Sequence, residues 1–342
     1  MKQGMIQAYF TQAFPKINIS LKIGEKCGNL HTLQSRFCLV KESLYDSILI
    51  ANAPLDCTLA TQNDICDFET EQYHKNIRFC LYGNFDCRLK DNLIYKAYCS
   101  LLQQNDSKTN QLSLHIMVSK QIPVGGGLGG GSVNAAITLL LLNEILELNY
   151  DMDTLLALAK TLGSDVAFFL KIYSQNQNSI DSYFFTTYKL QKQDLQDILT
   201  TFETQNIFCD DFIESLQFKQ KQDSIKFLSA NVFEVGDKIE PFYEKLPKFL
   251  IHCNEISCNT AAVYKEFEKL KLLNSEKLNV NSIDLKQDSI KLLKNHTLNE
   301  LNDLYKPACN LYNLAHIEKQ LCNTYNNVYF SGSGSSFFSI QE

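Results

Sequence analysis

The residues with the most distinctive chemistry in this chain are glycines. Only 14 of the 342 residues are glycine, yet six of the seven residues at 125–131 are. Glycine adopts backbone conformations closed to other residues and lets a ligand approach the main chain closely. The cluster lies between a predicted strand at 112–118 and a predicted helix at 132–148, and a helix N-terminus offers free N–H groups to an anion. The cluster therefore predicts a phosphate-binding loop.

Two known classes of phosphate loop provide a comparison. A Walker A loop needs a lysine directly after its last glycine, and no lysine follows here, so that class is excluded. Gly125, Gly127 and Gly130 match the G-x-G-x-x-G spacing of nicotinamide-binding proteins. Those proteins carry an acidic residue about 20 positions later, at the end of a second strand, whereas Asp151 and Asp153 begin another predicted helix. A nicotinamide-binding oxidoreductase is kept as an alternative.

The hydrophobic pattern around the loop predicts a mixture of strands and helices. Alternation predicts strands at residues 16–23, 33–40, 47–50, 112–118, 248–253, 328–330 and 336–340. Helical periodicity predicts helices that begin after residue 91 or 92, at 132–148, at 153–162 and at 260–273. Residues 171–228 lack glycine and proline, and Leu195, Leu199 and Phe202 share a helical face there, which predicts an amphipathic helix.

Composition excludes several classes of protein. The net charge is -6, and only three of the 32 basic residues are arginine, which argues against a nucleic-acid-binding surface. The longest apolar runs fall far short of the roughly 18 residues of a membrane span, and the first residues lack the apolar stretch of a signal peptide. We therefore expect a cytoplasmic protein with no membrane partner. The 12 cysteines show no C-x-x-C spacing, so we expect small core residues and neither zinc knuckles nor redox dithiols.

Residues 123–136 resemble the central motif of the superfamily of galactokinase, homoserine kinase and mevalonate kinase. Within it the segment is most similar to the family of 4-diphosphocytidyl-2-C-methyl-D-erythritol kinases, whose motif is P-x-G-x-G-L-G-G-G-S-S-N-A-A. Ten positions from Gly125 to Ala136 agree with this motif, and Val133 replaces its second serine.

Five other segments resemble motifs of the same family, in the same order. They are residues 15–18 (P-K-I-N), 28–35 (G-N-L-H-T-L-Q-S), 91–94 (D-N-L-I), 162–169 (L-G-S-D-V-A-F-F) and 331–335 (S-G-S-G-S). Leu30 stands where the family usually has tyrosine. The resemblance covers nearly the whole chain except residues 171–228, which look like a family-atypical insertion. The insertion could be a lid, a subunit contact or a surface excursion.

The resemblance implies an α+β fold with two domains and an active site between them. Residues 1–170 would form an N-terminal ATP-binding α/β domain, and residues 229–342 a C-terminal, ferredoxin-like α+β domain that binds the substrate. The intervening insertion at 171–228 would be partly helical. Gly332 and Gly334 would bring the backbone of the C-terminal domain close to the ATP loop.

The resemblance also implies a catalytic pair. Asp165 would be the base that receives the proton of the attacking hydroxyl, and Lys16 its electrostatic partner. Taken alone, Asp165 would be interpreted as a helix N-cap after Gly163. Phosphoryl transfer implies ATP and Mg²⁺, with Ser132 as the candidate metal ligand. The implied nucleotide-binding residues are Pro123, Val124, Gly125, Gly126, Gly127, Leu128, Gly129, Gly130, Gly131, Ser132 and Val133, together with Asn92.

By the same resemblance, the substrate would be 4-diphosphocytidyl-2-C-methyl-D-erythritol, phosphorylated on its 2-hydroxyl in the non-mevalonate isoprenoid pathway. His31 would hydrogen-bond the cytosine, Tyr264 would stack on it, and Asn18 and Thr260 would contact the substrate. Two alternatives stay open besides the oxidoreductase. One is another kinase of the superfamily, such as one acting on mevalonate, and the other is a non-catalytic protein on the kinase fold. The oligomeric state, monomer or homodimer, is also open.

Overall fold

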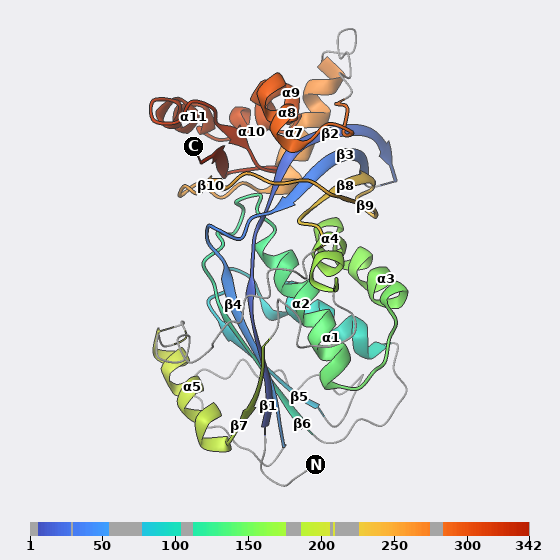
Figure 1. Cartoon of the computed structure of the whole chain (residues 1–342), viewed down its shortest axis with the longest axis vertical. Helices are drawn as coiled ribbons and strands as arrows, with labels where there is room; N and C mark the ends of the chain where they lie inside the picture. Colours follow the sequence, from blue (N-terminus) through green and yellow to red (C-terminus); the bar gives the residue numbers. More distant parts are fainter. Residues whose placement is uncertain are drawn as a thin grey trace. The chain divides into compact units, whose positions relative to one another are not determined.

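The computed structural model describes residues 6–28, 30–54, 77–103, 112–175, 186–205, 208, 226–273 and 283–341. The chain forms two compact units that interleave along the sequence (Figure 1). The first unit comprises Met1–Ala13, Tyr45–Gln121 and Gly131–Ile225, and the second comprises Phe14–Leu44, Ile122–Gly130 and Lys226–Glu342. This grouping differs from the linear division at residues 170 and 228, because two early segments pack with the C-terminal part.

The first unit is built on one five-stranded sheet with the order β5-β6-β4-β1-β7. Its strands are β1 (Ile6–Ala13), β4 (Asp46–Pro54), β5 (Ile77–Gly83), β6 (Leu112–Ser119) and β7 (Thr186–Leu190). Among the described strands of this sheet, β5 and β6 pair in parallel and the other pairs are antiparallel. Successive side chains of a strand point to opposite faces, and both faces of this sheet carry buried apolar residues. Each face must therefore be covered by other elements.

Helices cover the two faces of this sheet (Figure 1). On one side lie α1 (Leu93–Gln103), α2 (Gly130–Ile145), α3 (Met152–Leu162) and α4 (Ser164–Tyr173), preceded by the 3-10 turn η2 (Leu89–Asp91). Tyr98 of α1 packs against Phe79 of β5, with ring centroids 4.4 Å apart. The expected N-cap of α1 is confirmed, since Asn92 Oδ1 accepts a hydrogen bond from the N–H of Ile94 at 2.9 Å.

The opposite face is covered by elements from residues 171–228, the segment that we interpret from the sequence as an insertion. Here β7 adds an edge strand to β1, and α5 (Lys192–Gln205) follows it. Leu195, Leu199 and Phe202 of α5 are buried in one cluster with alternate residues of the central strands, which confirms the predicted amphipathic helix. Residues 176–185, 206–207 and 209–225 of the expected insertion lie outside the described part. The described part is integral to the first unit, because it buries one face of the sheet.

The second unit contains two antiparallel sheets. One has the order β2-β3-β8-β9 and the other β10-β12-β11. The strands are β2 (Lys16–Cys27), β3 (Leu30–Leu39), β8 (Ser229–Glu234), β9 (Lys238–Phe242), β10 (Phe249–His252), β11 (Tyr329–Phe330) and β12 (Phe337–Ile340). The helices are α7 (Thr260–Leu273), α8 (Ser289–Asn295), α9 (Leu298–Leu301), α10 (Tyr305–Leu311) and α11 (Leu314–Cys322). The predicted α+β class is confirmed.

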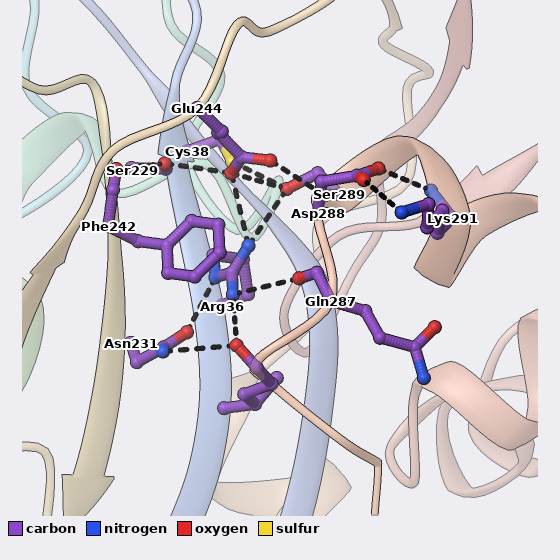
Figure 2. A network of polar contacts seen from close by, with 11 residues as sticks. Arg36, Cys38, Ser229, Asn231, Phe242, Glu244, Gln287, Asp288, Ser289 and Lys291 are labelled. Atoms are coloured by element: carbon purple, nitrogen blue, oxygen red, sulfur yellow. Dashed lines mark hydrogen bonds and ion pairs between the residues drawn. The ribbon is translucent and has the colours of Figure 1, made fainter.

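A buried arginine ties four segments of the second unit together (Figure 2). The guanidinium of Arg36 on β3 lies 3.4 Å from the centroid of the Phe242 ring and donates to Glu244 Oε1 at 3.1 Å. Glu244 in turn accepts from the backbone N–H of Ser289 at 2.7 Å. Burial lowers the pKa of Arg36, while the neighbouring Glu244 opposes this effect. Removal of one partner of such a buried pair typically costs about 3–5 kcal/mol, because the other charge is left buried without its partner.

One expectation from composition is wrong. Of the nine described cysteines, all free thiols, only Cys38, Cys80 and Cys258 are buried. Four of the others are exposed and two are half-buried. Cysteine is small and only weakly polar, so a surface position costs it little, and its abundance here does not reflect the needs of the core.

Candidate active site

The glycine loop joins β6 to α2, as the sequence predicts, and its backbone is unusual. Gly127 has φ +70°, a conformation that other residues rarely adopt. A Cβ atom at Gly127 would lie 2.2 Å from the carbonyl oxygen of Ser331, which is too close for any side chain. Glycine is therefore required here both for its conformation and for the close approach of another backbone segment.

That second segment is the C-terminal S-G-S-G turn. The N–H of Ser335 donates to Gly125 O at 2.9 Å, and the N–H of Ser336 donates to Gly126 O at 3.1 Å. The hydroxyl of Ser331 donates to Gly127 O at 3.1 Å. The two glycine-rich motifs thus pack backbone against backbone within the second unit, so the expectation that they meet is confirmed.

Lys16 lies beside this loop. It is buried on β2, with 3% of its surface exposed, and its Nζ donates to Asn18 Oδ1 at 2.7 Å and to Gly127 O at 3.1 Å. Its backbone N–H also donates to Leu128 O at 3.0 Å. Asn18 is oriented by a hydrogen bond from its Nδ2 to Ser35 Oγ at 3.0 Å. The structure therefore brings two predicted site residues, Lys16 and Asn18, to the glycine loop.

A second group of predicted residues meets at the start of β3 and at α7. The rings of His31 and Tyr264 stack with centroids 5.9 Å apart. Nε2 of His31 lies 2.9 Å from Oε1 of Glu268, which also accepts from Lys26. Hydrogen bonds from Lys26 and His31 lower the pKa of Glu268. The structure thus forms an aromatic site with a carboxylate behind the histidine.

Two further residues flank this aromatic site. Thr260, the first residue of α7, lies with its hydroxyl 2.8 Å from the hydroxyl of Ser333 in the C-terminal turn. Leu30, next to His31, is 59% exposed. The side chain at position 30 therefore lies on the surface, where the family usually places an aromatic ring.

The remaining predicted residues belong to the first unit. Asp165 is the second residue of α4, and Gly163 occupies the N-cap position, so the interpretation of Asp165 as the N-cap is wrong. Ser132 lies in the first turn of α2, half-buried, and is followed by the fully buried Val133. Asn92 caps α1. The two candidate catalytic residues, Lys16 and Asp165, are thus supplied by different units.

Sequence reasoning missed several polar residues around these sites. Asn302 donates from Nδ2 to Phe330 O and Gly332 O, both at 3.0 Å, and so holds the C-terminal turn. Glu268 was also missed, although its spacing of four residues from Tyr264 places both on one face of α7. Asp46, Lys120 and Asn134 form a third unpredicted cluster. The residues next to Asn302 and Asp46 in the sequence do not indicate a role for either, because their hydrogen-bond partners are far away in the sequence.

No ready-made metal cage is present in the described ranges, where no three His, Cys, Asp or Glu side chains converge. Mg²⁺ usually keeps several waters and takes only one or two protein ligands beside substrate phosphates. The hydroxyl of Ser132 at the start of α2 fits that limited role.

Comparison with known proteins defines the structural class of this protein. Residues 92–171 match the family described as the GHMP kinases N terminal domain. A crystal structure of 4-(cytidine 5'-diphospho)-2C-methyl-D-erythritol kinase shares the fold, with a TM-score of 0.58 and 20% identity over 97% of this chain and 90% of that one. Mevalonate kinase of L. major in complex with R-mevalonate also shares it, with a TM-score of 0.51 and 10% identity over 97% and 86% of the two chains. The fold is that of a GHMP kinase.

Two curated relatives show to which family of GHMP kinases the chain belongs. The 4-diphosphocytidyl-2-C-methyl-D-erythritol kinase of Helicobacter acinonychis (strain Sheeba) is 31% identical over 96% of both chains. The enzyme of the same name from Campylobacter jejuni subsp. jejuni serotype O:6 is 30% identical over 96% of this chain and 99% of its own. This chain belongs to the family of 4-diphosphocytidyl-2-C-methyl-D-erythritol kinases, which are phosphotransferases.

The nicotinamide-binding alternative is wrong, because the chain belongs to a kinase family and the sheet beside its glycine loop is mainly antiparallel, whereas dinucleotide-binding domains have parallel sheets. Within the described ranges, no helix is long and apolar enough to cross a membrane.

Proposed function

We propose that this chain transfers the γ-phosphoryl group of ATP to the 2-hydroxyl of 4-diphosphocytidyl-2-C-methyl-D-erythritol, a step of the non-mevalonate isoprenoid pathway. The observation that carries the proposal is the position of Lys16. Its ammonium is buried at the edge of the glycine loop and bonded to Asn18 and Gly127. An ammonium placed at the edge of a phosphate-binding loop can stabilise the negative charge of a bound phosphate chain.

The glycine loop provides the binding site for ATP. Backbone N–H groups between Pro123 and Val133, with the first turn of α2, would donate to the phosphate oxygens. Ser132 would contact the β- or γ-phosphate or its Mg²⁺, and Asn92 would lie near the adenine. When bound, Mg²⁺ would neutralise charge on the phosphates.

The reaction is a direct displacement at the γ-phosphorus. The oxygen of the 2-hydroxyl forms a bond to the γ-phosphorus, and the bond between that phosphorus and the β,γ-bridging oxygen breaks, so that ADP leaves. Asp165 would accept the hydroxyl proton. The Lys16 ammonium would stabilise the charge that develops on the phosphoryl oxygens.

The aromatic site would select the substrate. Tyr264 offers a face for the cytosine ring. Nε2 of His31 is engaged by Glu268, and its Nδ1, which has no hydrogen-bond partner among the described residues, is the ring nitrogen that would bond to the base. Thr260 and Asn18 would contact the rest of the molecule. Mevalonate has no base, so a mevalonate kinase would have no use for this pair of residues. Kinases that act on either substrate share this fold, so the fold alone does not determine the substrate. The residues that contact the substrate would determine it.

A competition between acceptors tests the proposal. The purified protein is given ATP with either the diphosphocytidyl substrate or mevalonate, and ADP release is measured with a coupled enzyme assay. We expect a kcat/KM at least about 10³-fold higher with the diphosphocytidyl substrate, since a base-binding site loses several kcal/mol when its ligand is absent. Equal rates with both acceptors, or faster turnover of mevalonate, would contradict the proposal.

A further inference from the structure

A buried carboxylate in the first unit bonds to both sides of the glycine loop. Asp46 is the first residue of β4, and its side chain has no exposed surface. Its Oδ1 accepts from the backbone N–H of Gln121 at 2.8 Å. Its Oδ2 accepts from Asn134 Nδ2 at 3.0 Å and pairs with the ammonium of Lys120. We call Asp46 and these three donors the Asp46 clamp.

The donors of the Asp46 clamp bracket the loop in the sequence. Lys120 and Gln121 follow β6 and lead directly into the loop, and Asn134 lies in the first turns of α2, directly after it. One carboxylate thus fixes the distance between the strand that enters the loop and the helix that leaves it. The loop has its two ends set before any ligand binds.

Asn134 depends on Asp46 for its orientation. Its Nδ2 bonds to the carboxylate, while its buried Oδ1 has no hydrogen-bond partner among the described residues. Asn134 lies two residues after Ser132, on the helix whose N-terminus would face the phosphates. Any movement of the carboxylate would therefore be transmitted to the first turn of α2.

Stability alone is a weak reason for this arrangement. A buried ion pair must overcome the desolvation of both charges, and well-packed apolar residues are often at least as stabilising. Three directional hydrogen bonds to one carboxylate do something that apolar packing does not, because they fix both distance and orientation. The clamp has the properties of a positioning device.

We infer that Asp46 is a positioning residue for ATP binding: it holds the two ends of the glycine loop so that the loop N–H groups and the N-terminus of α2 are preorganised for the phosphates. This inference rests on the proposed ATP-binding role of the loop. It assigns no contact between Asp46 and the nucleotide.

The variant Asp46→Asn tests the inference, since it keeps the shape of the side chain and removes its charge. One amide oxygen is unable to satisfy the three donors, and the new NH₂ group meets another donor. We expect the dissociation constant for ATP, measured by titration calorimetry on folded protein, to rise at least tenfold. The dissociation constant for the diphosphocytidyl substrate should change less than twofold.

The matched control is Glu244→Gln. Glu244 is also a buried carboxylate that pairs with a cation and accepts from a backbone N–H, but it lies in the Arg36 network of Figure 2. This control should lower the melting temperature and leave the ATP dissociation constant within twofold of wild type. It separates loss of stability from loss of preorganisation.

A second variant covers the case in which Asp46→Asn does not fold. Asn134→Ala removes only the helix side of the clamp and should raise the ATP dissociation constant at least threefold, again without an effect on the other substrate. Unchanged ATP affinity in the folded variants, with only a lower melting temperature, would overturn the inference. A wild-type protein that binds no ATP would instead overturn the proposed function, so the two failures are distinguishable.

Discussion

Nζ of Lys16 lies 2.7 Å from Oδ1 of Asn18, and both side chains are buried on β2. Residues two apart on a strand share a face, so this pair presents one cation and one amide in the same direction. Gly127 O, 3.1 Å from the same Nζ, brings the pair to the glycine loop. The pair therefore places an ammonium and an amide at the edge of the glycine loop.

Lys16→Met should therefore abolish most of the activity. We expect kcat to fall about 10²–10³-fold, as for the loss of a charge that stabilises a transition state. The measurement is steady-state kinetics with the diphosphocytidyl substrate. The matched control is Lys22→Met on the same strand, because Lys22 is also buried but pairs with Asp303. Equal losses in both variants would indicate that Lys16 acts only through stability.

Asp165→Asn tests the proposed base. The change keeps the size of the side chain and removes its ability to take up a proton, so kcat should fall about 10²–10⁴-fold while ATP affinity is retained. Single-turnover quench experiments and ATP titration measure the two effects. Asp153→Asn is the control, since Asp153 is likewise an acidic residue in the first turn of a helix, α3. Near wild-type turnover of Asp165→Asn would exclude this residue as the base.

The aromatic site predicts a change in KM. Tyr264→Leu should raise KM for the diphosphocytidyl substrate about tenfold to a hundredfold, because stacking on a base contributes about 1–3 kcal/mol. KM for ATP should stay the same. Tyr325→Leu is the control, since Tyr325 also packs against a histidine, His252, with ring centroids 4.3 Å apart.

The same site predicts that one substitution improves substrate binding. Leu30→Tyr restores an aromatic ring at an exposed position next to His31 and should lower KM for the diphosphocytidyl substrate several-fold by adding a second stacking face. An unchanged KM in both Tyr264→Leu and Leu30→Tyr would place the base elsewhere.

The core of the first unit predicts a pH dependence of stability. Burial, assisted by the charge of Arg78, lowers the pKa of His115 from 6.5 to about 4. Because the folded-state pKa is the lower one, the unfolded state takes up the proton first, and stability is lost as pH falls from about 6.5 to about 4. The loss would reach about 3 kcal/mol, from 1.36 kcal/mol per pKa unit.

Urea unfolding at several pH values measures this effect. His115→Gln should be less stable at pH 7, because Tyr82 and Ser113 lose a well-placed partner. Its stability should nevertheless fall less steeply between pH 6.5 and 4 than that of wild type. Replacement of the exposed His316 by Gln should leave the wild-type slope unchanged. Parallel slopes for His115→Gln and wild type would contradict the assignment.

Local patterns made much of the fold predictable. The bounds of α7 agree with the predicted helix at 260–273, and α2 lies within a few residues of its predicted range. The two glycine motifs were also predictable, since glycine is the residue that tight backbone contact demands. Strands β1 and β5 were not, because apolar runs of this length fit a strand or a buried helix equally well.

The polar networks could not be predicted from the sequence, for a different reason. Asp46 meets Lys120 and Asn134 at separations of 74 and 88 residues, and Arg36 meets Glu244 at 208. Such pairs depend on strand order and register, which no local spacing encodes.

Phosphorus NMR of the product identifies the phosphorylated hydroxyl most directly. The carbon that bears the 2-hydroxyl also bears the methyl group and no hydrogen, so a phosphate ester there lacks coupling to a carbinol proton. After reaction with ATP we predict one new uncoupled phosphomonoester resonance, the resonances of ADP, and an unaltered diphosphate linkage to cytidine. A new resonance split by carbinol protons, or no new phosphomonoester at all, would contradict the proposed function.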